Sequence, residues 1–237
     1  MDSSAAVIEI SHISKEYSVG SGLKEVIYRD ACLEAHSGEI TLIMGESGSG
    51  KTSLLRQIAL IDNKQVGTIC YFNQQVQQLS TAKKAKLRAK HIGFIFQSFA
   101  LIEEFSVVEN CALPLIMNGT SRRHALLQAA NKIEHYIPGL NVEKKPTQLS
   151  GGQQQRVAII RALIHEPQVV IADEPTGNLD SANSKRVRDA LLEMAHQQNS
   201  AVIIVSHDPS FIDIADRYYE LQDSSVDGVK STLMRIK

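Results

Sequence analysis

The chain has 237 residues, of which 43% are hydrophobic and 22% are charged, so it can form one large or two small domains around a substantial core. A net charge of −1 does not favour a protein that binds nucleic acid or another polyanion. Cys32, Cys70 and Cys111 are widely spaced without metal-type pairing, which indicates reduced thiols in a cytosolic protein.

Short apolar runs rich in β-branched residues alternate with helical patterns, which predicts an α/β fold with a mainly parallel sheet covered by helices. The longest apolar runs have the length of strands rather than membrane spans, and the amino end lacks the layout of a secretory signal. The expected strands are 7–12, 27–34, 40–44, 92–96, 169–172, 201–205 and 217–221, and the expected helices begin near Lys51, Thr81, Arg122, Gly151, Ser181 and Pro209.

The stretch from about residue 98 to residue 148 has a different pattern from the rest of the chain. It is mostly helical, with breaks at "NGTS" (118–121) and "IPG" (137–139), and it contains few obvious strands. We interpret it as part of a helical subdomain of about 98–164, inserted into a core formed by about 1–97 and 165–237. The whole chain is then a single domain.

A glycine-rich segment, "GESGSGKT" (45–52), lies between an expected strand and an expected helix, as the phosphate-binding P-loop motif requires. Glycines let backbone N–H groups curl around phosphate oxygens, and the helix amino end adds positive character. Lys51 is suited to the β- and γ-phosphates and the Thr52 hydroxyl to Mg²⁺. The predicted nucleotide-binding residues here are Gly45, Glu46, Ser47, Gly48, Ser49, Gly50, Lys51, Thr52 and Ser53.

Two acidic residues end the apolar run "QVVIADEP" (168–175). Because ligands of open α/β sheets bind beyond the carboxyl ends of the strands, this run directs Asp173 and Glu174 towards the expected phosphates. Asp173 is suited to hold Mg²⁺, directly or through water, and Glu174 to accept a proton from the attacking water. Alone, such a pair more often caps the next helix, but together with the glycine-rich segment it favours a catalytic site.

Two further polar residues follow expected strands. His207, in "SHD" (206–208), should follow a strand beside the phosphate-binding strand, from which its imidazole can reach a γ-phosphate. Gln97, in "GFIFQSF", ends another strand, where its amide can contact the metal and the attacking water. The other histidines are interpreted as structural.

In order and separation, these motifs resemble those of the ATP-binding cassette (ABC) family of transport ATPases over essentially the whole chain. The family pattern also includes the signature "LSGGQ" (149–153) and "NLD" (178–180). The resemblance implies a P-loop NTPase fold with a RecA-like core, an antiparallel β subdomain and a helical subdomain. It also implies that Tyr17 stacks on adenine, although a tyrosine of the core is the alternative. Residues 87–115 and 172–180 are similar to the LolD- and MacB-like branch.

The family resemblance also implies that two chains pair head to tail around two ATP molecules. Ser150, Gly151, Gly152 and Gln153 of one chain would then face the γ-phosphate held by Lys51 of the other, and Asp180 would lie near the seam. Ser150 is a good helix N-cap, and the adjacent glycines allow close approach of an anion. The alternative is an ordinary capped helix without a ligand.

The function expected from the resemblance is ATP hydrolysis, with ATP and Mg²⁺, coupled to a separate integral membrane permease subunit. The cargo would be a lipoprotein, peptide or drug-like molecule, and the chain would lie on the cytoplasmic face of the cell membrane. Two alternatives remain: a soluble cassette ATPase of DNA repair or translation, and a cassette that drives a membrane partner regulating cell-wall remodelling. The basic run "KKAKLRAK" (83–90) is interpreted as a solvated helix face, and no nucleic-acid partner is expected.

Overall fold

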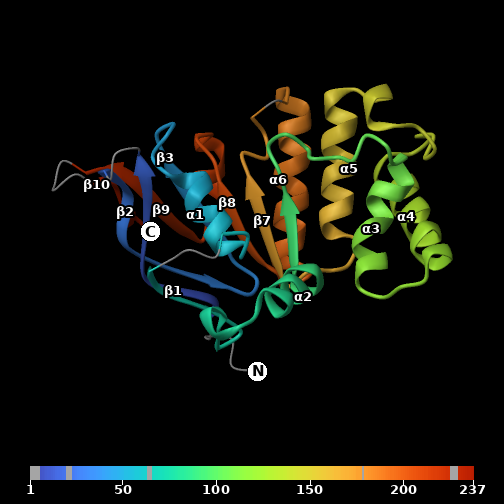
Figure 1. Ribbon diagram of the computed structural model, residues 1–237. Helices are drawn as coiled ribbons and strands as arrows, with labels where there is room; N and C mark the ends of the chain where they lie inside the picture. The colour runs from blue at the N-terminus through green and yellow to red at the C-terminus, as the bar shows by residue number, and fades with distance from the viewer. Residues whose placement is uncertain (1–5, 20–22, 63–65, 178, 225–228) are drawn as a thin grey trace.

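The computed structural model describes residues 6–19, 23–62, 66–177, 179–224 and 229–237. The strands in these ranges form one curled ten-stranded sheet, in the order β5-β4-β1-β2-β10-β9-β3-β8-β7-β6 (Figure 1). The strands are β1 (Ala6–Val19), β2 (Leu23–His36), β3 (Ile40–Gly45), β4 (Val66–Tyr71), β5 (Gln74–Gln75), β6 (Ile92–Ile95), β7 (Val169–Asp173), β8 (Ala201–Val205), β9 (Arg217–Asp223) and β10 (Val229–Arg235). The α-helices are α1 (Lys51–Ile58), α2 (Thr81–His91), α3 (Val107–Met117), α4 (Arg122–Tyr136), α5 (Gly151–Leu163) and α6 (Ser181–His196).

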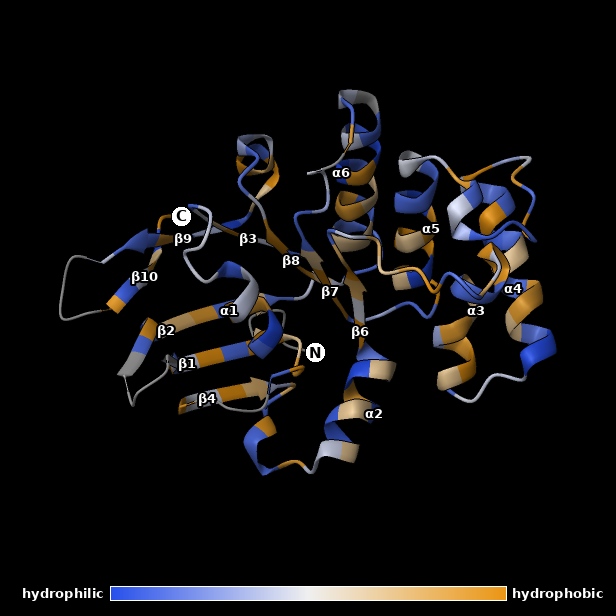
Figure 2. Cartoon of the chain, turned by 45° about the horizontal axis from the view of Figure 1, so that its top comes forward, coloured by the Kyte–Doolittle hydropathy of each residue, from blue (hydrophilic) through white to orange (hydrophobic). Residues whose placement is uncertain are grey.

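The half of the sheet from β9 to β6 is parallel throughout. In it β3 pairs with β9 and β8, and β7 pairs with β8 and β6. Strands β3, β7 and β8 are mostly hydrophobic (Figure 2), because helices or other strands cover both faces of the parallel sheet. Leu54 and Leu55 of α1 belong to the buried cluster on one face, and Leu191 and Met194 of α6 to the cluster on the other. Strands β3, β6, β7 and β8 of this parallel half therefore present their carboxyl ends at the same edge.

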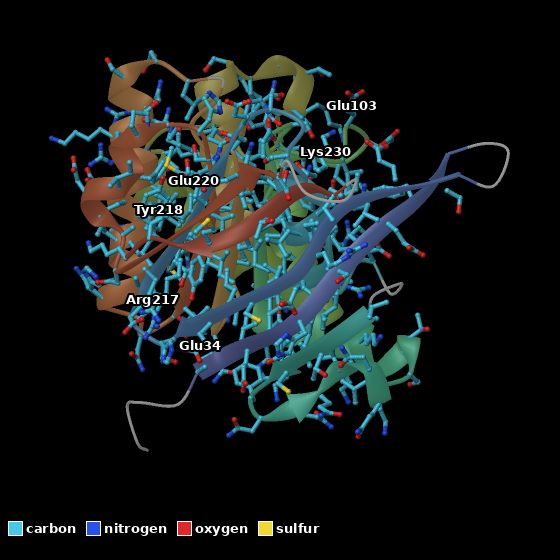
Figure 3. The ribbon with its side chains drawn as sticks, turned by 90° about the vertical axis from the view of Figure 1, so that its left-hand side faces the viewer. Glu34, Glu103, Arg217, Tyr218, Glu220 and Lys230 are labelled. Atoms are coloured by element: carbon cyan, nitrogen blue, oxygen red, sulfur yellow. The ribbon has the colours of Figure 1, made fainter. Side chains whose placement is uncertain are left out.

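The other half of the sheet is mostly antiparallel. Strand β1 pairs antiparallel with β2 and β4, and β9 pairs antiparallel with β10, whereas β10 and β2 run parallel. An ion-pair group joins the two halves: the Arg217 Nε lies 2.6 Å from the Glu39 Oε2, and the Arg217 Nη1 lies 3.6 Å from the Glu34 Oε2. Figure 3 shows Arg217 and Glu34 at the same end of the sheet. Strand β2 thus remains attached to the strand that flanks β3.

Helices α3, α4 and α5 form a separate group beside the sheet (Figure 1). They enclose their own cluster of buried residues, to which Val107 of α3, Ile133 of α4 and Val157 of α5 belong. Asn110 is fully buried, and its side chain accepts a hydrogen bond from the Ile102 N–H at 2.8 Å and donates one to the Ile102 carbonyl at 3.0 Å. This side chain therefore ties α3 to the segment that links it to the sheet.

The α/β class and the mainly parallel core are confirmed, and several boundaries differ from the sequence expectation. Strands β1 and β2 are longer than 7–12 and 27–34, because each has an antiparallel partner along most of its length. Strands β4, β5 and β10 were not expected. The helix expected at Pro209 is a 3₁₀ helix, Pro209–Ile214. The breaks at 118–121 and 137–139 are confirmed by the ends of α3 and α4.

The start of α3 carries a capping box that makes a pH-dependent contribution to stability. The Glu109 carboxylate accepts hydrogen bonds from the Ser106 N–H at 3.0 Å and the Arg122 guanidinium at 2.8 Å. The bond from the Ser106 backbone is the main cause that lowers the pKa of Glu109 from its ordinary value of 4.5. Because the folded-state pKa is lowered, this stabilisation is present above pH 4.5 and is lost as the pH falls through the folded-state pKa.

We therefore expect a Glu109→Gln variant to lose less unfolding free energy than the wild type between about pH 6 and pH 3. Glutamine can still accept the bond from Ser106, so the capping geometry is kept while the charge is removed. Urea unfolding at a series of pH values would measure the difference. Equal losses in the two proteins would show that this carboxylate contributes nothing to acid sensitivity.

Candidate nucleotide-binding site

A cavity of about 580 Å³ opens at the carboxyl ends of β3, β6, β7 and β8. Each of these strands ends next to a predicted functional residue, as expected for a parallel sheet in which every strand directs its end towards the same crevice. The residues that line the cavity are Ile27, Gly45, Glu46, Ser47, Gly48, Gly50, Lys51, Thr52, Ser53, Gln97, Asp173, Glu174 and His207.

The glycine loop (45–50) has backbone angles and contacts that require glycine at its two ends. Gly50 has a φ of 99°, and a Cβ there would lie 2.4 Å from the Ile27 Cγ2. A Cβ at Gly45 would lie 2.6 Å from the carbonyl oxygen of Leu221. Gly50 is also the residue before α1, so the loop delivers the chain directly into the helix amino end. The backbone N–H groups of this helix end are available to an anion in the cavity.

A Gly50→Ala variant is expected to bind ADP at least about tenfold more weakly, because the positive φ costs a side-chain-bearing residue about 1–2 kcal/mol and the Cβ also collides with Ile27. Gly119→Ala is the matched control: Gly119 has a φ of 93°, but no atom of the residues that the structure describes lies within 4 Å of its Cβ position. The control should lose stability and keep its ADP affinity. Calorimetric titration with ADP distinguishes the two variants. Wild-type affinity in Gly50→Ala would contradict the assignment of the glycine loop as the phosphate site.

Lys51 is buried at the start of α1 and points back into the glycine loop. Its ammonium donates hydrogen bonds to the carbonyl oxygens of Gly45 and Glu46, both at 2.7 Å. Burial lowers the pKa of Lys51, and the nearby carboxylates of Glu174 and Asp173 oppose that shift. The Lys51 ammonium therefore lies between the loop that would hold phosphates and the two acids across the cavity.

Asp173 has the properties of a cation ligand. Burial is the main cause that raises its pKa, the charge of Glu174 adds to the effect, and Lys51 opposes it. Its Oδ1 atom is buried without a hydrogen-bond partner among the described residues. A buried carboxylate oxygen of this kind is costly unless it is paired. Asp173 and the exposed Thr52 hydroxyl are oxygen donors that line the same cavity, so the site fits Mg²⁺.

Glu174 is held in place by the residues that follow β8. Its Oε2 accepts hydrogen bonds from the Ser206 hydroxyl at 3.1 Å and the His207 N–H at 3.4 Å, and its Oε1 lies 2.9 Å from the His207 Nδ1. Glu174 has a φ of 45°, which is unusual for a residue with a side chain. The expected adjacency of β8 and β3 is confirmed, and it brings His207 to the cavity.

Gln97 lies two residues after the end of β6 and lines the cavity. The segment after it is strained, since Phe99 and Ala100 have φ values of 61° and 48°. The Arg161 guanidinium from α5 donates to both carbonyl oxygens, at 2.8 Å to Phe99 and 2.5 Å to Ala100. Helix α5 therefore holds the segment that follows Gln97.

Tyr17 lies at the edge of the site and does not line the cavity. Its hydroxyl is 3.2 Å from the hydroxyl of Ser53, which is part of the cavity lining, and its side chain is 45% exposed. The alternative of a core tyrosine is therefore wrong. Ser49 also departs from the expected pattern, because it is buried behind the loop and its hydroxyl has no partner among the described residues.

The signature segment (149–153) begins α5 and lies outside this cavity. Ser150 and Gln153 form a capping box: the Ser150 hydroxyl accepts from the Gln153 N–H at 3.3 Å, and the Gln153 Oε1 accepts from the Ser150 N–H at 3.0 Å. The two following glutamines are structural, since the side chain of Gln154 donates to the Pro146 and Leu149 carbonyl oxygens and that of Gln155 to the Pro175 carbonyl oxygen.

The two glycines of the signature differ in their surroundings. A Cβ on Gly151 would meet nothing within 4 Å, so no contact within the described chain explains this glycine. A Cβ on Gly152 would lie 2.9 Å from the Asn183 Nδ2. Gly152 therefore also has a packing role that the sequence did not suggest. Asn183 is held by Asp180, which caps α6 and accepts from the Asn183 side chain at 2.9 Å. Asn178 of the "NLD" motif lies outside the described residues.

The structure therefore separates the predicted residues into two groups. One group lies on the cavity, with Tyr17 at its edge and Ser49 buried behind it, and the other, formed by the signature segment and Asp180, lies away from it. Sequence reasoning missed Ile27, which lines the cavity, and Ser206, which binds Glu174. Ser206 directly precedes His207 at a strand end, which is a usable signal. Ile27 carries no such signal, since it is one of several alternating apolar residues in β2.

The protein is a P-loop nucleotide-binding protein. This class is defined by a glycine loop that leads from a strand into a helix, a buried lysine at the start of that helix and acids on a nearby strand. The chain belongs to the ABC transporter family, because the family model described as "ABC transporter" matches residues 28–177. The family and the ATPase activity expected from the sequence are confirmed: the chain is an ATP-hydrolysing cassette.

Curated relatives and solved structures agree with this family. The chain is 37% identical to a lipoprotein-releasing system ATP-binding protein LolD of Shewanella frigidimarina, covering 96% of this chain and 95% of that one. It is 38% identical to the LolD protein of Hydrogenovibrio crunogenus, covering 92% and 94%. A dimeric, post-hydrolysis structure of the ATP-binding cassette MJ0796 bound to ADP and Pi matches with a TM-score of 0.84 and 31% identity, covering 97% of this chain and 99% of that one.

Proposed function

We propose that two copies of the chain close head to tail over two ATP molecules and power a separate membrane subunit that extracts lipoproteins. The observation that carries the dimer is the position of the signature segment. Ser150 caps the amino end of α5, and no described residue lies close to the Cβ position of Gly151, yet this helix end lies outside the cavity of its own chain. A helix amino end without a ligand in its own chain is suited to a phosphate held by another. The solved dimeric structures of the ATP-binding cassette MJ0796 support this arrangement.

In this proposal the catalytic residues of one chain are Glu174, His207, Lys51 and Gln97. Glu174 accepts the proton of the attacking water, and Lys51 exchanges its loop carbonyls for phosphate oxygens. His207 releases Glu174 and stabilises the charge on the γ-phosphoryl group, while Gln97 orients the water.

The remaining predicted contacts hold the nucleotide from two sides. Backbone N–H groups of the loop from Gly45 to Ser53 bind the phosphates, and Tyr17 stacks on the adenine at the edge of the site. From the second chain, the signature segment faces the γ-phosphate, and Asp180 lies near the seam. Thr52 and Asp173, with Gln97, would hold Mg²⁺. When bound, this ion neutralises charge on the phosphate oxygens.

We further propose that the chain is one nucleotide-binding domain of residues 1–237 with a helical subdomain of about 98–164. The separate buried cluster of α3, α4 and α5 supports this division. Because α5 holds the segment after Gln97, closure at the nucleotide can be passed to the helices that would contact the membrane subunit. Among the described residues, no helix is long and apolar enough to cross a membrane. We place the chain on the cytoplasmic face of the membrane, bound to its partner.

The relatives named lipoprotein-releasing system ATP-binding protein support the choice of cargo. The test is to purify the tagged chain from detergent-solubilised membranes, reconstitute the complex and measure ATP-dependent release of a lipoprotein from the vesicles. We expect co-purification of an integral membrane subunit and release that requires ATP. ATP hydrolysis without release of lipoprotein would contradict the cargo, and a chain recovered only without membrane protein would contradict the partner.

A further inference from the structure

A buried lysine lies directly behind the ring of Tyr17. Lys15 precedes Tyr17 by two residues on β1, so the two side chains leave the same face of the strand. The Lys15 ammonium lies 4.7 Å from the centroid of the Tyr17 ring, within the range of a cation–π interaction. The Lys15 side chain is only 6% exposed, which is unusual for lysine.

Asp62 keeps this ammonium in place. It follows α1, the helix that begins at Lys51, and its carboxylate Oδ2 forms an ion pair with the Lys15 Nζ. A buried ammonium without a partner would be costly, so the ion pair fixes the position of Lys15 as well as its charge. The pair also joins β1 to the end of the phosphate-binding helix.

The tyrosine ring is consequently held on two sides. Its hydroxyl contacts Ser53 at 3.2 Å, and Lys15 covers one of its faces. The ring nevertheless remains 45% exposed, which leaves surface for a planar base to stack on. A cation over one face draws electron density from the ring, which favours stacking of an electron-rich purine on the other face.

We propose that Lys15, anchored by Asp62, is a positioning residue that holds the Tyr17 ring for base stacking and so sets the contribution of the base to nucleotide affinity. This inference rests on the proposed function, in which Tyr17 stacks on adenine. Lys15 is not among the residues that line the cavity, so we expect its effect to be confined to ligands that carry a base.

The test compares ADP with inorganic pyrophosphate, which lacks the base, by calorimetric titration of each variant. Lys15→Met is expected to weaken ADP binding about three- to tenfold and to leave pyrophosphate binding unchanged, while Lys15→Arg keeps the cation and stays within about twofold of the wild type. The double variant Lys15→Met/Asp62→Leu removes both charges, and it replaces Lys15→Met in these titrations if the single variant does not fold. In a Tyr17→Ala background, Lys15→Met should have no further effect on ADP.

Three results would overturn the inference, and they are distinguishable. Unchanged ADP affinity in Lys15→Met, with weakened affinity in Tyr17→Ala, refutes the role of Lys15 and leaves stacking intact. Equal weakening of the ADP and pyrophosphate affinities means that the substitution damaged the glycine loop itself, so that Lys15 is only structural. Unchanged ADP affinity in Tyr17→Ala refutes the stacking that the proposed function assumes.

Discussion

Replacing Lys51 with alanine is expected to lower kcat for ATP hydrolysis by about 10²- to 10³-fold, the loss that follows removal of one charge-stabilising donor. The Lys51 ammonium lines the cavity, and it donates to the Gly45 and Glu46 carbonyl oxygens that surround the expected phosphate position. Alanine leaves those carbonyl oxygens facing the phosphate oxygens without a counter-charge. A steady-state phosphate-release assay measures the loss.

The matched control is Lys145→Ala. Lys145 donates to the Glu104 carbonyl oxygen at an exposed site outside the cavity lining, so it tests the removal of a lysine hydrogen bond in general. The control should hydrolyse ATP at close to the wild-type rate. Retained hydrolysis in Lys51→Ala, with an unchanged melting temperature, would refute the assignment of the phosphate site.

A Glu174→Gln variant is expected to lose turnover by about 10²- to 10⁴-fold, as removal of a general base does, while its affinity for ATP is kept. Glutamine has nearly the same shape as glutamate, and its oxygen can still accept a hydrogen bond from Ser206. What it lacks is a carboxylate that can take the proton of the attacking water. Single-turnover hydrolysis measures the chemical step, and calorimetric titration measures the affinity.

The second acid provides the contrast for this prediction. Asp173 carries the unpaired Oδ1 that fits a cation, so Asp173→Asn should weaken the Mg²⁺ dependence of ATP binding, which Glu174→Gln should not. The two variants thus separate a base from a metal ligand. Wild-type turnover in Glu174→Gln would show that another group acts as the base.

Much of the fold was predictable because the parallel strands are continuous hydrophobic runs whose carboxyl ends carry the motifs. Strands β4, β5 and β10 were not predictable on the same grounds. Strand β5 has two residues, both glutamine, and β4 contains Gly67. Strand β10 pairs antiparallel with β9, which directly precedes it, and parallel with β2, about two hundred residues earlier in the chain, through pairs such as Val229 with Val26. The distant partner has no local signature in the sequence.

The site shows the same division between local and distant information. The glycine loop, Glu174 and His207 were predictable because each motif is a few residues long and lies at a strand end. The residues that hold the site together come from distant parts of the chain. Arg161 holds the segment after Gln97 from a helix more than sixty positions later, and Asp62 anchors Lys15 from beyond the end of α1. The sequence gives the chemistry of these groups and no indication of their partners.

The central claim is that an active site needs the glycine loop of one chain and the signature segment of another. It is tested most directly by the molar mass of Glu174→Gln in solution, measured by light scattering with ATP and with ADP. The comparison is Glu174→Gln/Gly151→Asp, because the Cβ of an aspartate at Gly151 would lie within 4 Å of no atom in the described part of its own chain, and its charge would repel a phosphate of the other chain. We predict twice the mass of one chain for Glu174→Gln with ATP, and the mass of one chain with ADP and for the double variant. A single-chain mass for Glu174→Gln with ATP, at concentrations that saturate binding, would contradict the shared site.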